Sequence, residues 1–394
     1  MATEAGPCPG SSSEQSSSDA RFPPKYDINI PLQASDLTDG TSPSVEDTVH
    51  ELATGQLLAL TDVLTDALNE ATPPYTAEQQ RKRLWFAAIK PPMYSVAFVP
   101  ILVGAAAAYA QTGVALAARC LQLTLGSICI IAWLNLSNDA FDAETGVDGD
   151  KPESVVNLTG NRTGVLLLAN LFLAVGLATL AYAISSVGDP RIGYMLGAAI
   201  CMGYVYQGPP FRLSYKGLGE PLCFFAFGPL ATSAFYLAML PRVAGYPIQP
   251  VVPALVQTLS VLVGITTSVI LFCSHFHQID GDTAAGKRSP LVRLGSQGGL
   301  KVLRSAVIAL YVLAAAGSAA GLLPWTVPAA MVVSLPKARS LLDFAEAHLH
   351  VPALIKPLKQ YAVKWHCMAG IAIVVGLLAP RWFPQLPGLH WAGV

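Results

Sequence analysis

The sequence has few charged residues for its length. Only 12% of its 394 residues are Asp, Glu, Lys or Arg, whereas 53% are hydrophobic, and the mean hydropathy is positive. Soluble domains of this total length would need more charge to cover their surfaces. The composition nearly excludes a soluble multi-domain protein and favours an all-α, polytopic membrane protein.

Cysteine is also scarce and shows no paired spacing. The seven cysteines include no CxxC pair, and most of them lie inside apolar runs. We interpret them as small buried hydrophobic residues. Neither a disulfide framework nor a zinc site is indicated.

The net charge of −1 conceals two opposed parts of the chain. Residues 1–80 contain two basic and thirteen acidic residues, whereas residues 81–394 contain 22 basic and twelve acidic residues. We therefore divide the chain into an acidic N-terminal tail, 1–80, and a transmembrane domain, 81–394. The first part of the tail is too polar to offset its ordering entropy, so we expect disorder up to about residue 45.

Two further features of the tail concern its structure and its role. Leucines recur at intervals of three and four residues between Val45 and Glu70, which predicts a short amphipathic helix. The tail has the serines of a transit peptide without its arginines. A leader, a mature N-terminus and a regulatory tail therefore all stay open.

Long apolar runs follow from Met93 onward. A helix crosses a hydrocarbon core of about 30 Å with about 20 residues, and most of the runs reach this length. Nine membrane helices are predicted, the eighth of them short, at 93–112, 117–137, 164–187, 192–208, 221–240, 254–274, 303–323, 325–336 and 366–383.

Nine helices place the N-terminal flank and every second loop on one side of the membrane. That side then carries 18 of the 22 basic residues, and the other side carries only Arg119, Arg191, Arg242 and Arg381. The positive-inside rule orients the N-terminus toward the cytoplasm or stroma. We expect the body to lie in a lipid bilayer and to have no nucleic-acid partner.

A cluster of acids, NDAFDAETGVDGDK, ends the second predicted helix. Asn138, Asp139 and Asp142 lie three or four residues apart, so we expect them on one helix face. Carboxylates at the bilayer edge need a cation or a water-filled cavity, and oxygen ligands of this kind suit Mg²⁺. Gly146 breaks the helix and lets Asp148 turn back toward the site. The alternative is a solvated acidic loop.

A second cluster, SHFHQIDGDTAAGKRSP, follows the sixth predicted helix. Gln278 and Asp282 are four residues apart and share a helix face. Asp282 is therefore the better candidate metal ligand and Asp280 the weaker one. Lys287 and Arg288 are suited to a diphosphate, one as a point charge and the other as a bidentate fork.

The histidines of this segment have two interpretations. His275 and His277 could bind zinc, but no cysteine or third histidine lies near them in the sequence. We interpret them instead as polar lining residues, one of which could accept a proton.

A third polar loop, between the fourth and fifth predicted helices, lies on the same side. It contains Tyr206, Arg212 and Tyr215, which are candidate substrate-binding residues but also fit simple interfacial anchoring. Lys90, just before the first predicted helix, is equally open between an anchor and a ligand.

Acidic clusters at two helix ends, with basic residues on the same face, describe a magnesium–diphosphate site at the mouth of an apolar cavity. An isoprenoid diphosphate needs both surroundings, because its head is anionic and its tail is apolar. A secondary transporter is the alternative from another class, since transporters also concentrate charge within the membrane. The sequence has no inverted repeat that would support it.

The two acidic motifs resemble those of the UbiA superfamily of intramembrane aromatic prenyltransferases. More narrowly, the chain resembles the naphthoate branch of plants, algae and cyanobacteria, and the resemblance covers about residues 83–383. Its motifs are residues 138–148, YQGPP, GLGE, FGPL, HFHQ and AGKRSPLVRLG. The chain departs from the superfamily at Gly146 and Gln278, where Asp is frequent, and Asp148 is the candidate substitute in the first motif.

The resemblance implies a nine-helix bundle with a central apolar cavity in a chloroplast or cyanobacterial membrane. It implies Mg²⁺-dependent transfer of a phytyl or other polyprenyl group from its diphosphate to 1,4-dihydroxy-2-naphthoate, with decarboxylation, in phylloquinone or menaquinone biosynthesis. Homogentisate and chlorophyllide are alternative acceptors.

Motifs and resemblance together assign the site residues. The catalytic residues are Asp139, Asp142 and Asp282. The metal ligands are Asn138, Asp139, Asp142, Asp148, Asp280 and Asp282. The diphosphate-binding residues are Lys151, Arg212, Lys287 and Arg288, and the substrate pocket contains Tyr206, Tyr215, His275, His277 and Gln278.

Overall fold

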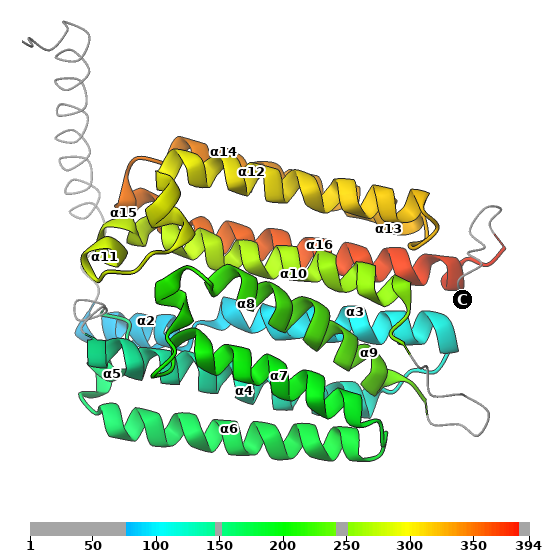
Figure 1. The fold of residues 1–394 in the computed structure, drawn as a ribbon, viewed down its shortest axis with the longest axis horizontal. Coiled ribbons are helices and arrows are strands. Elements are labelled where there is room, and N and C mark those ends of the chain that lie inside the picture. Colours follow the sequence, from blue (N-terminus) through cyan, green and yellow to red (C-terminus); the bar gives the residue numbers. More distant parts are fainter. Residues whose placement is uncertain (1–75, 146–151, 242–250, 386–394) are drawn as a thin grey trace, which may run out of the picture. The chain divides into compact units, whose positions relative to one another are not determined.

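The structure is a computed structural model that describes residues 76–145, 152–241 and 251–385. Every regular element in these ranges is a helix (Figure 1). The amphipathic helix predicted in the tail, and also Asp148 and Lys151, lie outside the described residues.

Long helices run side by side through the bundle (Figure 1). In chain order they are α3 (Ser95–Thr112), α4 (Ala117–Thr145), α6 (Arg162–Ser185), α7 (Pro190–Gln207), the run α8 (Gly219–Phe225), η3 (Ala226–Thr232) and α9 (Ser233–Met239), α10 (Ala254–His275), α12 (Pro290–Ala319), the run α13 (Thr326–Met331), η5 (Val332–Ser334) and α14 (Leu335–Ala347), and α16 (Leu358–Trp382). These nine helical columns of the described chain correspond to the nine predicted helices.

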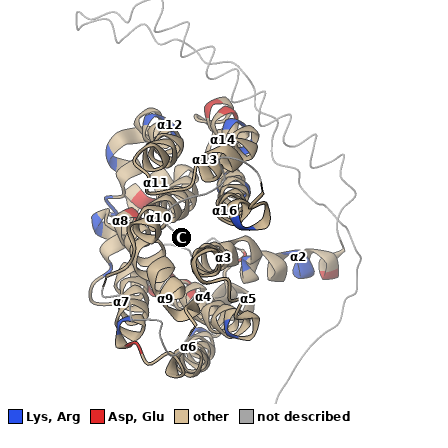
Figure 2. Cartoon of the chain, turned by 90° about the vertical axis from the view of Figure 1, so that its right-hand side faces the viewer, with Lys and Arg blue, Asp and Glu red and all other residues tan. Residues whose placement is uncertain are grey.

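Seven spans among the described residues are long and apolar enough to cross a membrane. They include every column except α7 and α13–α14. Figure 2 looks along the columns and shows that uncharged residues, drawn in tan, make up most of each one. The protein is therefore an all-helical, multi-pass membrane protein.

Short elements connect the columns at one end of the bundle. They are α2 (Ala77–Ile89), η1 (Pro91–Tyr94), α5 (Val155–Thr159), η2 (Leu213–Lys216), η4 (Phe276–Gln278), α11 (Ile279–Ala284) and α15 (Pro352–Ile355). Figure 1 shows α2, α5, α11 and α15 together at its left end. This arrangement agrees with the topology inferred from alternating loops, and it collects the polar motifs on one side.

Glycines allow neighbouring columns to approach closely. A Cβ added to Gly126 of α4 would lie 2.8 Å from Leu180 Cγ on α6, and one added to Gly176 would lie 2.9 Å from Ile130 Cδ1. Small residues at such contacts are typical of helix packing in membranes. They fix α6 against the helix that carries the first motif.

The segment η3 is π-helical and contains Pro229. A proline inside a helix cannot donate to the preceding turn, and a local widening to π-helix is a common way to absorb this loss. Thr232 Oγ1 donates to the Phe227 carbonyl oxygen at 2.9 Å and satisfies one carbonyl there. The widened turn places Ala226 and Phe227 along the pocket described below.

The two largest errors among the predicted helix boundaries lie at the eighth and seventh helices. The eighth helix does not end at residue 336 but continues through α14, so Lys337 and Arg339 lie on a helix and not in a loop. The reason is that α14 is amphipathic and buries one stripe, formed by Ala338, Leu341 and Ala345. Helical structure leading into the seventh helix begins at Pro290, well before residue 303, and is kinked at Gly295, whose φ is 66°. The Ser289 hydroxyl caps its start by accepting the Val292 N–H at 3.3 Å.

Candidate active site

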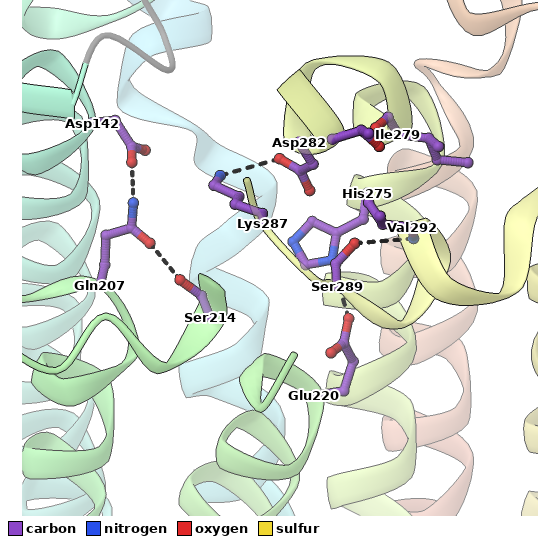
Figure 3. A network of polar contacts seen from close by, with 11 residues as sticks. Asp142, Gln207, Ser214, Glu220, His275, Ile279, Asp282, Lys287, Ser289 and Val292 are labelled. Carbon is purple, nitrogen blue, oxygen red and sulfur yellow. Dashed lines mark hydrogen bonds and ion pairs between the residues drawn. The ribbon is translucent and has the colours of Figure 1, made fainter. Parts of the chain in front are cut away.

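The last turns of α4 carry the first motif. Asn138 lines an apolar pocket, and the Asp142 carboxylate accepts a hydrogen bond from Gln207 Nε2 at the end of α7. Ser214 Oγ on η2 donates to Gln207 Oε1 at 2.8 Å, and Figure 3 shows the three side chains in a row. The position of Asp142 is therefore set by three different elements.

Asp139 has a different set of partners. Its Oδ1 lies 2.7 Å from Lys90 Nζ, and its Oδ2 accepts the Val155 N–H at 3.1 Å. Successive helix residues are rotated by about 100°, which turns Asp139 away from the direction of Asn138. The prediction that all three motif residues share one face is therefore wrong for Asp139. Lys90, open between anchor and ligand in the sequence, is its ion-pair partner.

Arg212 lies close to the end of the first motif. Its Nη2 is 3.3 Å from Glu144 Oε2, which also lies 3.0 Å from Arg162 Nη2. The buried Nε of Arg212 has no hydrogen-bond partner among the described residues. Arg212 can therefore still offer a donor to an anion.

Asp282 and Lys287 of the second motif form a buried pair opposite Asp142 (Figure 3). The carboxylate oxygen of Asp282 lies 3.1 Å from Lys287 Nζ, and Asp282 is 3% exposed. Lys287 Nζ also lies 5.0 Å from the ring centroid of Tyr215, a favourable position for a cation. The Arg288 N–H donates to the Tyr215 carbonyl at 2.8 Å, so the third loop and the second motif form one wall.

The other residues of the second motif are less buried. The side chains of Asp280 and Arg288 are exposed, whereas His277 and Gln278 are half-buried. The structure thus brings Asp282 and Lys287 together, and it leaves Asp280 and Arg288 at the open edge of the site.

His275 contacts Glu220, an acid that ends the GLGE motif but was not predicted as a site residue. Its Nδ1 lies 3.0 Å from Glu220 Oε1, at the start of α8, and both side chains are largely buried. Glu220 Oε2 is buried without a hydrogen-bond partner among the described residues. Glu220 and Gln207 stand in the GLGE and YQGPP motifs, but the residues alone give neither a role in the site. Ser214 is missed because single polar residues near helix ends are common.

An apolar pocket opens between these motifs. Its polar lining residues are Asn135, Asn138, Tyr206, Cys223 and Thr267. A second, still more apolar pocket adjoins it deeper in the bundle, and the two share Val96, Ile131, Leu134, Gly203, Ala226 and Phe227. The two pockets form one apolar path from the polar end into the bundle, as a cavity for an isoprenoid tail requires.

The donor chemistry determines which metal the site suits. Within the described ranges, no group of three or more His, Cys, Asp or Glu side chains is arranged to hold a metal ion. Asn138 offers an oxygen donor inside the pocket, and Asp142 and Asp282 offer carboxylates on opposite sides of the polar network in Figure 3. Mg²⁺ is commonly held by one or two carboxylates while waters and substrate phosphates complete its shell. These residues therefore fit Mg²⁺ that is bound together with a diphosphate, and they do not fit a cage made by protein alone.

Comparison with known proteins identifies the family. Residues 97–353 match the family model described as the UbiA prenyltransferase family. The chain belongs to this family. The 2-carboxy-1,4-naphthoquinone phytyltransferase of Arabidopsis thaliana, described as chloroplastic, is 46% identical over 327 residues, 82% of this chain and 85% of that protein.

Two further UbiA-family relatives extend the comparison. The 2-carboxy-1,4-naphthoquinone phytyltransferase of Synechocystis is 44% identical over 78% of this chain and 98% of that protein. A solved UbiA homologue from Archaeoglobus fulgidus, bound to GPP and Mg²⁺, has a TM-score of 0.44 and 16% identity over 74% of this chain and 99% of that chain. The family match, the two phytyltransferase relatives and the seven apolar spans make this chain a membrane-embedded prenyltransferase, and the transporter interpretation is set aside.

Proposed function

We propose that this protein transfers a phytyl, or another polyprenyl, group from its diphosphate to 1,4-dihydroxy-2-naphthoate with loss of CO₂, in phylloquinone or menaquinone biosynthesis. The observation that carries the proposal is the apolar path, whose outer pocket is lined by Asn138 and Tyr206, at the same end of the bundle as Asp142 and the Lys287–Asp282 pair. The names of the two phytyltransferase relatives support a phytyl donor and a carboxylated naphthoquinone-type acceptor, and the Escherichia coli relative named 1,4-dihydroxy-2-naphthoate octaprenyltransferase supports the dihydroxy form. The chloroplast name of one of them supports a chloroplast or cyanobacterial membrane as the location.

The diphosphate binds at the polar mouth in this proposal. Lys287 and Arg212 contact its oxygens from two sides, and Arg288 adds charge at the edge, while Lys151 stays a prediction from the sequence. Asn138, Asp142 and Asp282 would hold Mg²⁺, and Asp280 and Asp148 are further candidates from the sequence. Bound Mg²⁺ neutralises charge on the diphosphate and makes it a better leaving group.

The prenyl tail lies along the apolar path. Ile131, Leu134 and Phe227 line both pockets and exclude water from the allylic carbon. Exclusion of water matters because water would otherwise capture the allylic cation as an alcohol. The aromatic acceptor then occupies the polar-lined part of the outer pocket, near Asn138 and Tyr206.

The bond changes follow from this placement. The carboxylated ring carbon bonds to the allylic carbon while the allylic carbon–oxygen bond breaks and diphosphate leaves. The neighbouring hydroxyl gives its proton to His275, which Glu220 orients, and becomes a ketone. Loss of CO₂ leaves its electron pair as an enolate, and the proton returns from His275 to the enolate oxygen. The product is the prenylated naphthoquinol, and no net proton is consumed.

An assay in detergent tests the proposal. The purified protein should convert phytyl diphosphate and 1,4-dihydroxy-2-naphthoate to prenylated product, and EDTA should stop the reaction until Mg²⁺ is restored. Asp142→Ala should abolish turnover in a protein that remains folded. Preferential prenylation of homogentisate or chlorophyllide in competition would overturn the acceptor assignment, and absence of any prenylated product would overturn the function.

A further inference from the structure

A buried ion pair joins Lys90 to Asp139 at the end of the bundle that carries the site. The Nζ–Oδ1 distance is 2.7 Å, and the two side chains are 18% and 3% exposed. The other carboxylate oxygen accepts the Val155 N–H at 3.1 Å. Asp139 therefore bridges three elements: the C-terminus of α2, its own helix α4, and the first residue of α5.

The backbone of Lys90 adopts a conformation that is uncommon for a side-chain-bearing residue. Its φ of 54° and ψ of 51° lie in the left-handed region, where it caps α2 immediately before Pro91. Such conformations cost free energy and persist where the surroundings hold them. The ion pair supplies a strong contact of this kind at the junction between α2 and η1.

Apolar residues surround the pair. Ala88, Ala140, Val155, Val156 and Val165 form a hydrophobic cluster separate from the main core. Two charges in such surroundings stabilise each other, whereas removal of one leaves the other buried and unpaired. Ala140 is completely buried in this cluster, so the rotation of the last turns of α4 is fixed on this side.

We propose that Asp139 is a positioning residue and not a metal ligand. Its pair with Lys90 sets the rotation of the α4 end, so that Asn138 faces the pocket and Asp142 faces Gln207. Since a helix rotates as a unit over one turn, loss of the pair displaces both candidate ligands. This inference deepens the proposed function and rests on it for the role of the metal site.

The pair is tested first by stability without metal or substrate. Thermal unfolding in detergent and EDTA is measured for the wild type, Asp139→Asn, Lys90→Met and the double variant. Each single variant should lower the midpoint by about 5 °C or more, and the double variant should recover at least about half of that fall. Lys82→Met breaks the exposed Lys82–Glu78 pair and is the matched control, with a change below about 1 °C.

Two measurements test whether Asp139 binds the metal. The first is the Mg²⁺ concentration that gives half of the Mg²⁺-induced rise in the unfolding midpoint, and the second is turnover. In the double variant this Mg²⁺ concentration should stay within about threefold of the wild-type value. Its turnover should be at least about tenfold higher than that of Asp139→Asn. Asp142→Asn should raise the half-maximal Mg²⁺ concentration more than about tenfold. Adding Lys90→Met to Asp142→Asn should not lower that concentration again.

Two results would overturn the proposal. One is a double variant with the turnover of Asp139→Asn and the Mg²⁺ requirement of Asp142→Asn, because a lost metal ligand cannot be replaced by removing a lysine. The other is a set of single variants as stable in EDTA as wild type. If both single variants fail to fold, a folded and active double variant supports the proposal and an unfolded one contradicts it. A wild type that transfers no prenyl group would contradict the proposed function. The unfolding midpoints of the four proteins in EDTA would still test the role of the Lys90–Asp139 pair.

Discussion

The side-chain amide of Gln207 donates to Asp142 and accepts from Ser214. The Asp142 carboxylate is therefore oriented by the end of α7. Gln207→Leu should lower kcat/KM for phytyl diphosphate roughly tenfold, because the loss of a hydrogen bond to a charged group is worth about 1.5–3 kcal/mol. Gln257→Leu, at the opposite end of the bundle, is the control and should change kcat/KM less than about twofold. Equal effects of the two substitutions would contradict the role of Gln207.

Lys287 joins both walls of the site, through Asp282 and the ring of Tyr215. Lys287→Met should raise KM for phytyl diphosphate by roughly 10- to 100-fold, because a cation that meets the diphosphate is lost. Steady-state kinetics at saturating acceptor measure this change. Lys337→Met, on the exposed face of α14, serves as the comparison and should leave KM within about twofold of wild type. A normal KM for Lys287→Met would remove Lys287 from the diphosphate site.

His275 and Glu220 lie 3.0 Å apart beside the pocket. His275→Asn should lower kcat by about 100-fold with little change in KM for the diphosphate, since a positioned proton acceptor contributes at least this factor. Glu220→Gln should have a smaller effect in the same direction, because Glu220 acts through His275. His350→Asn, at an exposed position, is the control. An unchanged kcat in His275→Asn would assign proton transfer to another group.

The deeper pocket should determine which prenyl chains are accepted. Ala199 on α7 lines only this inner pocket, so Ala199→Leu should shorten the space available to the tail. The ratio of kcat/KM for phytyl over geranyl diphosphate should fall about 5- to 10-fold. The adjacent Ala198→Leu does not fill the pocket and should leave the ratio unchanged. An unaltered ratio in Ala199→Leu would place the tail elsewhere.

Asp189 caps α7 at the end opposite the site and pairs with Arg191 at 2.6 Å. The hydrogen bond from Arg191 lowers the pKa of Asp189, while burial acts in the opposite direction. A carboxyl whose pKa is lower in the folded state stabilises the fold above its ordinary pKa, and this contribution is lost as the pH falls through the lower folded value. Asp189→Ala should be about 1 kcal/mol less stable at pH 7, and thermal unfolding should find this difference shrinking below about pH 4. A difference that grows with acid would contradict the assignment.

Much of the fold can be predicted from the sequence, because a long apolar run predicts a membrane helix. The end of the column α13–η5–α14 was predicted wrongly. Charged residues such as Lys337 lie on the exposed face of an amphipathic helix there, and in the sequence they look like the end of an apolar run. Spacing alone also placed Asp139 beside Asn138 and Asp142. It could not reveal Lys90, which is 49 residues away in sequence and turns Asp139 toward α2.

The site follows the same division. Asp142, Asp282 and Lys287 stand in dense polar motifs, which predict them as site residues. The structure places them at the same end of the bundle. Glu220 and Gln207 stand in the GLGE and YQGPP motifs, but each is a single polar residue at the end of an apolar run, and its role cannot be read from its sequence neighbours. Their contacts with His275 and Asp142 depend on how α7, α8 and α10 pack, which no local pattern specifies.

The most direct test of the central claim follows the carboxyl group of the acceptor. The wild-type protein is supplied with phytyl diphosphate, Mg²⁺ and 1,4-dihydroxy-2-naphthoate labelled in its carboxyl carbon, and both labelled CO₂ and prenylated product are measured. We predict one CO₂ for each molecule of phytyl-naphthoquinol, with both falling to background in EDTA. A prenylated product that retains the label, or product formation that is insensitive to EDTA, would contradict the account.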